Sequence, residues 1–328
     1  MVIYATIIKR TCMGHIVGGC GEFSQLNNRE CMSSPTGLPY VFVLDWDGTI
    51  AGRVDFQVQQ FLFHNTLKKH GFKPVRQHPI PPAFYPNAKL IRPGFASFVK
   101  AMKKIYPEVF FFIYTASEKA WAHQEIAWVE KTHGVQFMRP IFTRNDCVVD
   151  SAGNFRKSIG KVFPRIINAV SKATHRSFTT KERISILEQN TIIIDNNAVY
   201  IDRPDKMLLC PDYHYAVFEN LLHGVPTEAR THPVVQQNIL SMVNQGLLCP
   251  LSAPQEDAMK ALARQYEWLA VKCKGITQEN HVYETDSFWP YLKKLIVQNQ
   301  LRSFNVAIIR QLQDAVWKQV KKSQRQST

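Results

Sequence analysis

One short stretch, residues 41–50, constrains the fold of this chain more than any other. It reads Val-Phe-Val-Leu-Asp-Trp-Asp-Gly-Thr-Ile, so an apolar run ends in two carboxylates, Asp45 and Asp47. An unbroken apolar run of this kind is typical of a strand buried on both faces of a sheet. Two carboxylates this close together repel each other in a poorly hydrated site. We therefore expect that one of them takes up a proton or that a cation holds both.

Two further apolar runs predict strands beside the first one. Residues 110–114 are followed by Thr115, and residues 192–194 are followed by Asp195 and Asn196. Ligands of open α/β sheets bind at the carboxyl ends of the strands, which is where all of these polar residues would lie.

Helical patterns separate the three runs. One apolar stripe begins at Pro93, and a second helix is expected to follow the capping residue Ser117 and to end at Gly134. Residues 51–91 contain five prolines and predict an irregular cap insertion rather than a regular helix. Buried strands that alternate with helices predict an α/β fold, a parallel sheet flanked by helices.

The remaining chain suggests a division into four parts. Residues 1–38 show no period and predict a loosely packed leader, and residues 39–212 would form the α/β core. Residues 213–283 predict a helical insertion, and residues 284–328 predict C-terminal helices with a basic tail. The expected helices lie between 252 and 275, over 286–298 and over 304–322.

Composition narrows the class of protein. The 328 residues are 45% hydrophobic and 20% charged, which is ordinary for a soluble globular protein. The 40 Lys and Arg exceed the 26 Asp and Glu, which gives a net charge of +14. This excess fits a solvated basic surface, and it equally fits attraction to phosphates, to acidic phosphopeptides or to nucleic acid.

Targeting signals and cysteines point to a reducing compartment. Seven cysteines, an odd number in a chain of this length, do not form a disulfide framework. No apolar run approaches the roughly 20 residues of a membrane span, so we expect no membrane association. Lys9 and Arg10 follow the short apolar start instead of preceding it, which is the wrong order for a signal peptide. We expect a cytoplasmic or nuclear protein.

The strand ends together supply a set of groups that suits phosphoryl transfer. Carboxylate and amide oxygens are ligands that Mg²⁺ prefers. Transfer of a phosphoryl group also needs a nucleophile, a cation for the phosphate oxygens and a proton donor. The candidate residues are Asp45, Asp47, Thr115, Lys157, Asp195 and Asn196.

The motifs resemble those of a known group of phosphatases. Asp45 to Thr49 is similar to the Asp-x-Asp-Gly-Thr motif of the haloacid dehalogenase superfamily, whose fold is a Rossmann-like (HAD-like) parallel sheet. Phe112 to Ser117 resembles the Phe-Thr-Ala-Ser element of the FCP/SCP-type, or NLI-interacting-factor-like, phosphatases, which act on the C-terminal repeat of RNA polymerase II. Further stretches that resemble this family are Arg92-Pro93, Arg144 to Cys147, Lys157, Ile194 to Asn196 and Asp202 to Asp205.

This resemblance implies a Mg²⁺-dependent phosphatase and assigns roles to single residues. Asp45 would be the nucleophile that forms an aspartyl-phosphate, and Asp47 would be the general acid and base. Thr115 and Lys157 would hold phosphate oxygens, and Arg144 would contact the substrate. The metal would be bound by Asp45, by the backbone carbonyl of Asp47 and by Asn196, while Asp195 would hold the water shell of the metal or Lys157.

The sequence also departs from the FCP/SCP pattern, and these departures leave alternatives open. Gly48 stands where the family has Glu, Trp46 replaces a usual Leu, and Ser158 stands where the family usually has Asp. A phosphoserine or phosphothreonine protein phosphatase, with the polymerase repeat among its candidate substrates, is the leading interpretation. A polynucleotide 3′-phosphatase shares the Gly-Thr form of the motif and would suit the basic charge. A non-catalytic scaffold of the same fold would be marked by loss of the second aspartate, but Asp47 is present.

Two further expectations concern single segments. Ser117 is expected to do no more than cap its helix. Residues 301–328 are expected to form a helix with a basic end that binds acidic partners or nucleic acid and that is dispensable for turnover of a simple aryl phosphate.

Overall fold

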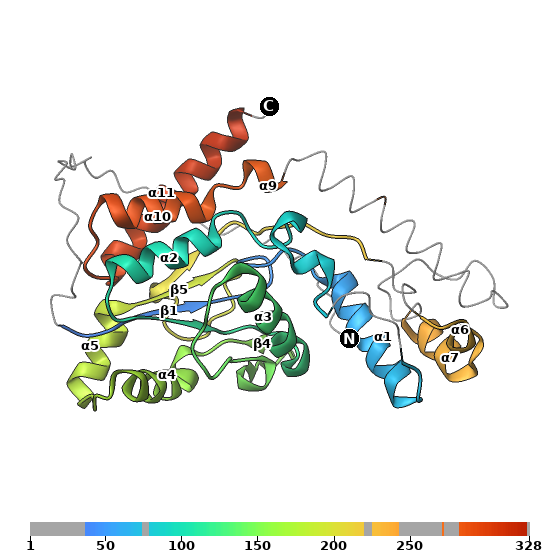
Figure 1. Cartoon of the computed structure of the whole chain (residues 1–328). Helices are drawn as coiled ribbons and strands as arrows, with labels where there is room; N and C mark the ends of the chain where they lie inside the picture. Colours follow the sequence, from blue (N-terminus) through green and yellow to red (C-terminus); the bar gives the residue numbers. More distant parts are fainter. Residues whose placement is uncertain (1–36, 74–78, 220–224, 243–270, 272–281, 327–328) are drawn as a thin grey trace.

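A parallel sheet of four strands forms the centre of the computed structural model, which describes residues 37–73, 79–219, 225–242, 271 and 282–326. The strand order is β2-β1-β5-β6, and every neighbouring pair is parallel. Figure 1 shows β1 and β5 side by side at the centre of the fold. The bounds of the strands are Tyr40–Leu44 for β1, Val109–Ile113 for β2, Thr191–Asp195 for β5 and Met207–Leu209 for β6. The predicted α/β fold with a parallel sheet is therefore confirmed.

Strand β1 is buried along its whole length because helices cover both faces of the sheet. Its side chains alternate between two hydrophobic clusters, as the pleat of a strand requires. Phe42 and Leu44 belong to one cluster, and Val41 and Val43 belong to the other. An apolar side chain is thus needed at every position, which is why the sequence shows an unbroken run instead of an alternating one.

Helices from distant parts of the sequence make these two layers. The first face is covered by α2 (Phe95–Ile105), α10 (Phe288–Gln298) and α11 (Val306–Gln326). The second face is covered by α4 (Ile159–Thr174) and α5 (Thr180–Asn190). Helix α3 (Lys119–His133) follows β2 and ends at Gly134, as predicted.

The prediction that residues 51–91 lack regular helix was wrong in its first half. Helix α1 spans Asp55–Lys69, and all five prolines of the stretch lie after it. Proline disturbs only the turn in which it stands, so prolines in the second half do not prevent a helix in the first half. Two short 3₁₀ turns, Pro82–Phe84 and Pro86–Ala88, begin at prolines further along.

Some elements are too short to be predicted from periodicity, and some predictions lie outside the described residues. Strand β6 and the hairpin of β3 (Val148–Val149) and β4 (Phe155–Arg156) were not predicted. The described part of the expected insertion contains α6 (Thr227–Thr231), α7 (Pro233–Met242) and α9 (Val282–Thr285). Most of the expected leader and almost all of the helix expected between 252 and 275 lie outside the described residues.

The C-terminal segment packs into the core, which contradicts its expected independence from the rest of the fold. Phe304 is fully buried, and its ring lies 5.2 Å from that of Phe42 and 5.9 Å from that of Tyr40, centroid to centroid. Helix α11 then packs on β6, where Trp317 Nε1 donates to the carbonyl of Leu209 at 3.1 Å. A helix that supplies core side chains cannot be removed without exposing them, so deletion of 301–328 would damage the whole fold.

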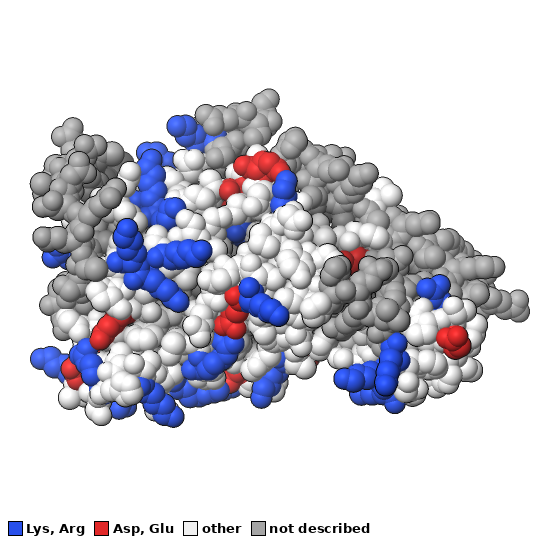
Figure 2. All heavy atoms as spheres, in the orientation of Figure 1, with Lys and Arg blue, Asp and Glu red and all other residues white. Residues whose placement is uncertain are grey.

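Basic side chains gather over two packed helices of the first layer. Figure 2 shows lysine and arginine side chains over the region of α2 and α10. Neither helix contains Asp or Glu, and Lys293 Nζ on α10 donates to Ser97 Oγ on α2 at 3.0 Å. The lysines of the two helices are Lys100, Lys103, Lys104, Lys293 and Lys294. We define these five residues as the basic face.

Within the described part of the chain, no helix is both long enough and apolar enough to cross a membrane.

We predict that Phe304→Ala lowers the free energy of unfolding by about 3–5 kcal/mol, because it empties a fully buried ring site beneath β1. Arg310→Ala, on the exposed face of α11, is the matched control and should change stability by no more than about 0.5 kcal/mol. Chemical denaturation measures both values. Equal stabilities of the two variants would contradict the conclusion that residues 301–328 are part of the hydrophobic core.

Candidate active site

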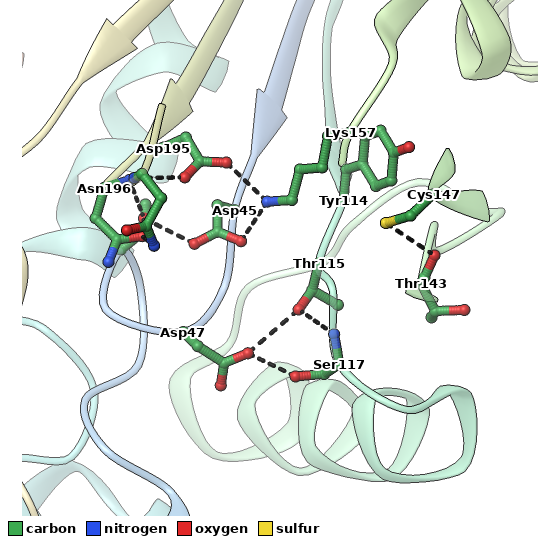
Figure 3. A network of polar contacts seen from close by, with 12 residues as sticks. Asp45, Asp47, Tyr114, Thr115, Ser117, Thr143, Cys147, Lys157, Asp195 and Asn196 are labelled. Atoms are coloured by element: carbon green, nitrogen blue, oxygen red, sulfur yellow. Dashed lines mark hydrogen bonds and ion pairs between the residues drawn. The ribbon is translucent and has the colours of Figure 1, made fainter. Parts of the chain in front are cut away.

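A buried lysine joins the ends of β1 and β5. Asp45 follows β1, and Asp195 is the last residue of β5. Lys157 follows β4, and its Nζ lies 2.5 Å from Asp45 Oδ1 and 2.7 Å from Asp195 Oδ2 (Figure 3). All three side chains are buried, so these are ion pairs in a poorly hydrated place, where their electrostatic interaction is strong.

The charges around Lys157 determine its pKa. Burial by itself would lower the pKa of Lys157, but the carboxylates of Asp195 and Asp45 raise it well above its usual value. Burial and the charge of Asp45 raise the pKa of Asp195. Two carboxylates that share one ammonium leave a negative balance when all three are ionised. The site therefore favours an additional positive charge.

Asp47 has a different environment from Asp45, although only one residue separates them. Its Oδ2 accepts hydrogen bonds from Ser117 Oγ at 2.6 Å and from Thr115 Oγ1 at 3.2 Å (Figure 3). Its Oδ1 is buried and has no hydrogen-bond partner among the described residues. Burial and the charge of Asp45 raise the pKa of Asp47 to about 6, against the opposite effect of the two hydroxyls.

The expectation that Ser117 only caps a helix was wrong. Helix α3 begins after Glu118, and no side-chain hydrogen bond caps it. The Ser117 hydroxyl instead donates to Asp47, while its backbone N–H donates to Thr115 Oγ1 at 3.1 Å. The helix starts one residue later than predicted, which leaves the serine in the loop that faces Asp47.

Thr49 and Asn196 connect the turn after β1 to the end of β5. Thr49 Oγ1 lies 3.1 Å from Asp45 Oδ2 and 3.2 Å from Asn196 Oδ1, so its single proton is shared between these two acceptors. The backbone N–H of Asn196 donates back to Thr49 Oγ1 at 3.1 Å. The neighbouring Gly48 has a φ of +77°. A Cβ at Gly48 would stand 2.4 Å from Asn196 Nδ2 and would also be strained by the positive φ, so this position favours glycine.

A buried arginine, Arg92, contacts the turn after β1. From the sequence it was identified only as part of the resemblance to the FCP/SCP-type family. The guanidinium of Arg92 pairs with Asp286 at 2.8 Å and donates to the carbonyl of Pro211, also at 2.8 Å. Trp289 Nε1 on α10 donates to the carbonyl of Thr49 at 3.2 Å. Arg92 Nη1 also donates to the carbonyls of Gly48 and Thr49, each at 3.5 Å, so Arg92 and Trp289 together hold the turn after β1.

Glu125, on α3, is a buried carboxyl that sequence reasoning missed. It is fully buried, and neither of its oxygens has a hydrogen-bond partner that meets normal geometry among the described residues. Burial first, and then the charge of Asp47, raise the pKa of Glu125 well above its usual value, while the indoles of Trp46 and Trp121 oppose the shift. The raised pKa favours the protonated, neutral form of Glu125. A lone glutamate inside a helical pattern gives no signal of this position.

Arg144 lies beside the loop that contacts Asp47. Among its described contacts there is none with Lys157, Asp45 or Asp195. Its Nε donates to the carbonyl of Ala116 at 2.8 Å, and its Nη1 pairs with Glu118 at 2.5 Å. Its guanidinium also lies 5.1 Å from the centroid of the Phe155 ring. The side chain is 23% exposed, so it remains accessible to a substrate at the rim.

The structure brings the predicted site residues together, and their oxygens suit a hard divalent cation. No group of three or more His, Cys, Asp or Glu side chains that could hold a metal ion occurs in the part of the chain that the structure describes. The donors available are instead mixed, a carboxylate from Asp45, the backbone of Asp47 and the amide of Asn196, which is a set that Mg²⁺ accepts. Asp195 is occupied by Lys157, so it would act through the lysine.

We predict that Glu125→Gln stabilises the protein increasingly as the pH rises above 4.5, the pKa of the glutamate in the unfolded chain. The folded-state pKa of Glu125 is raised, so above the unfolded value of 4.5 only the unfolded chain loses this proton, and the native protein loses stability. Glutamine removes that loss, which amounts to roughly 1 kcal/mol per pH unit.

Urea titrations at several pH values measure the difference, and Glu228→Gln, at an exposed position, is the control. A difference between Glu125→Gln and the native protein that does not change with pH would contradict a protonated Glu125.

Comparisons with known proteins identify the family of this chain. The family model of NLI interacting factor-like phosphatases matches residues 40–225. Fcp1, an essential RNA polymerase II CTD phosphatase, is a similar solved structure, with 15% identity, a TM-score of 0.32 and coverage of 83% of this chain and 69% of that chain. A fission yeast Fcp1 variant bound to beryllium fluoride has 15% identity, a TM-score of 0.30 and coverage of 75% and 67%. No curated protein sequence is similar enough to count as a relative.

The matched range covers more than half of the chain and contains Asp45, Asp47, Lys157 and Asn196. This protein therefore belongs to the family of NLI interacting factor-like phosphatases.

Proposed function

We propose that this phosphatase hydrolyses phosphate monoesters through a covalent aspartyl-phosphate on Asp45. The observation that carries the proposal is the different environment of the two carboxylates. Asp45 is paired with the Lys157 ammonium, whereas Asp47 accepts two hydroxyl hydrogen bonds at Oδ2 and burial raises its pKa to about 6. Two carboxyl groups whose surroundings separate their protonation are suited to be a nucleophile and a general acid.

The reaction would take two balanced steps. In the first, a carboxylate oxygen of Asp45 attacks the phosphorus, the bond from phosphorus to the ester oxygen breaks, and the leaving oxygen takes a proton from Asp47. In the second, Asp47 takes a proton from water, and the water oxygen attacks the phosphorus of the aspartyl-phosphate. Phosphate leaves, the Asp45 carboxylate is restored, and Asp47 is protonated again.

The remaining residues of the site would bind and orient the phosphate. Lys157 would hold a phosphate oxygen while it stays paired with Asp195, and Thr115 and Ser117 would keep Asp47 directed at the leaving group. A Mg²⁺ ion bound by Asp45, the backbone carbonyl of Asp47 and Asn196 would supply positive charge to the phosphate oxygens.

A phosphoserine or phosphothreonine of a protein is the substrate that we infer. Family membership supports this class, and the C-terminal repeat of RNA polymerase II is one candidate because Fcp1 is a phosphatase of that domain. The glycine of the Gly48-Thr49 pair was one reason to consider a polynucleotide 3′-phosphatase. The close approach of Asn196 explains this glycine without reference to the substrate, so that reason is weaker. Arg144, 23% exposed at the rim, would contact the phosphopeptide.

We predict that Asp45→Asn and Asp47→Asn fail at different steps. Asp45→Asn removes the nucleophile, so no phosphorylated protein forms. Asp47→Asn still forms the aspartyl-phosphate from an aryl phosphate, because a phenolate leaves without a general acid, but the intermediate then accumulates since no base activates water. Intact-protein mass spectrometry after rapid acid quench detects the added phosphoryl group. Phosphorylation of Asp45→Asn to the native extent would rule out this nucleophile.

We predict that a phosphoserine peptide is hydrolysed faster than a 3′-phosphorylated oligonucleotide at equal concentration. Arg144→Ala should raise KM for the peptide by about tenfold, the loss of one charge-assisted hydrogen bond, and should leave turnover of an aryl phosphate unchanged. Lys100→Glu, on the basic face, is the control, because it should weaken only the oligonucleotide reaction. The reverse order of rates, with a dominant effect of Lys100→Glu, would favour the polynucleotide function.

A further inference from the structure

Asp212 is held at the sheet edge where the site residues meet, although no predicted motif includes it. The residues on each side of it are fixed by backbone hydrogen bonds. The Cys210 N–H donates to the carbonyl of Asp195 at 2.9 Å, and the Tyr213 N–H donates to the carbonyl of Gly48 at 2.8 Å. The chain that leaves β6 is thus fastened across the ends of β5 and β1, and Asp212 lies between the two attachment points.

The carboxyl group of Asp212 and the amide of Asn196 approach each other at Gly48. Asp212 Oδ1 lies 2.2 Å, and Asn196 Nδ2 lies 2.4 Å, from the point at which a Cβ of Gly48 would stand. Burial raises the pKa of Asp212, while the neighbouring side chains of His214 and Asn196 lower it. His214 Nδ1 lies 3.3 Å from the other carboxyl oxygen, Oδ2. The two oxygens of Asp212 therefore face different partners.

The opposite end of the Asn196 amide faces the candidate nucleophile. Asn196 Oδ1 accepts from Thr49 Oγ1 at 3.2 Å, and Thr49 also donates to Asp45 Oδ2. The amide thus has a carboxylate at its nitrogen end. At its oxygen end lie the Thr49 hydroxyl and Asn197 Nδ2, which donates to Asn196 Oδ1 at 3.1 Å. A hydroxyl can donate or accept, whereas an ionised carboxylate only accepts, so it is the carboxylate of Asp212 that selects the orientation with the amide nitrogen toward it.

We propose that Asp212 is a positioning residue, which accepts a hydrogen bond from Asn196 Nδ2 and thereby turns Asn196 Oδ1 toward Asp45 and the divalent cation. This inference rests on the proposed function, in which Asn196 binds the metal. Only the oxygen end of an amide can ligate Mg²⁺, and a reversed amide would present N–H groups to the cation. Residues that orient a metal ligand in this way commonly change metal affinity by about 10- to 100-fold.

Binding of Mn²⁺ to the full-length protein without substrate tests the proposal, since carboxylate and carbonyl sites accept Mn²⁺ in place of Mg²⁺. Electron paramagnetic resonance of free Mn²⁺ gives the dissociation constant. Asp212→Ala should weaken binding by about 10- to 100-fold. Asp212→Asn keeps an acceptor oxygen in nearly the same shape, so its affinity should stay within about threefold of the native value. Asp314→Ala, an exposed carboxylate on α11, is the control for loss of one negative charge.

Each outcome decides between distinct explanations. Native affinity in Asp212→Ala would overturn the positioning role and leave the proposed phosphatase chemistry intact. Equal weakening in Asp212→Asn and Asp212→Ala would also overturn it, because the charge of Asp212, and not its acceptor oxygen, would then matter. A native protein that neither binds Mn²⁺ nor hydrolyses an aryl phosphate would overturn this inference and the proposed function together.

Discussion

The ammonium of Lys157 between Asp45 and Asp195 is the interaction on which the rest of the site depends. Two adjacent parallel strands end in carboxylates, and burial of both without a counter-charge would cost several kcal/mol. One lysine compensates them and joins β1, β5 and the loop after β4 at a single point. The lysine binds Oδ1 of Asp45 and thereby orients this carboxylate. The ion pair therefore stabilises the fold and also takes part in the proposed chemistry.

The C-terminal helices are as much a part of this site as the strand that carries the nucleophile. Trp289 donates to the turn after β1, and Asp286 pairs with Arg92, which also contacts this turn. Asp286 and Trp289 both come from the C-terminal part of the chain. The chain contacts this turn at Tyr213, whose N–H donates to the carbonyl of Gly48, and again at Trp289, whose Nε1 donates to the carbonyl of Thr49. A long insertion between two fixed points costs little in loop entropy, which explains how this fold accommodates one.

The sequence was informative wherever a residue is determined by its own neighbours. Asp45, Thr115 and Asn196 could be predicted because each follows an apolar run, and the ends of parallel strands converge. Ser117 was misjudged because the start of a helix is uncertain by one or two residues. Asp212, Glu125 and the Arg92–Asp286 pair were missed as parts of the site because their contacts come from distant segments, which local patterns do not encode.

The central claim is that Asp47 has a raised pKa and can give a proton to a leaving group, while Asp45 in the same motif is paired with Lys157. The most direct measurement is a pH titration of the carboxyl carbon resonances in ¹³C-labelled, metal-free protein, with Asp47 assigned from the spectrum of Asp47→Asn. The structure predicts a midpoint of about 6 for Asp47. A midpoint near the ordinary value of 3.8 would contradict the account, because Asp47 would then hold no proton to give to a leaving group at neutral pH.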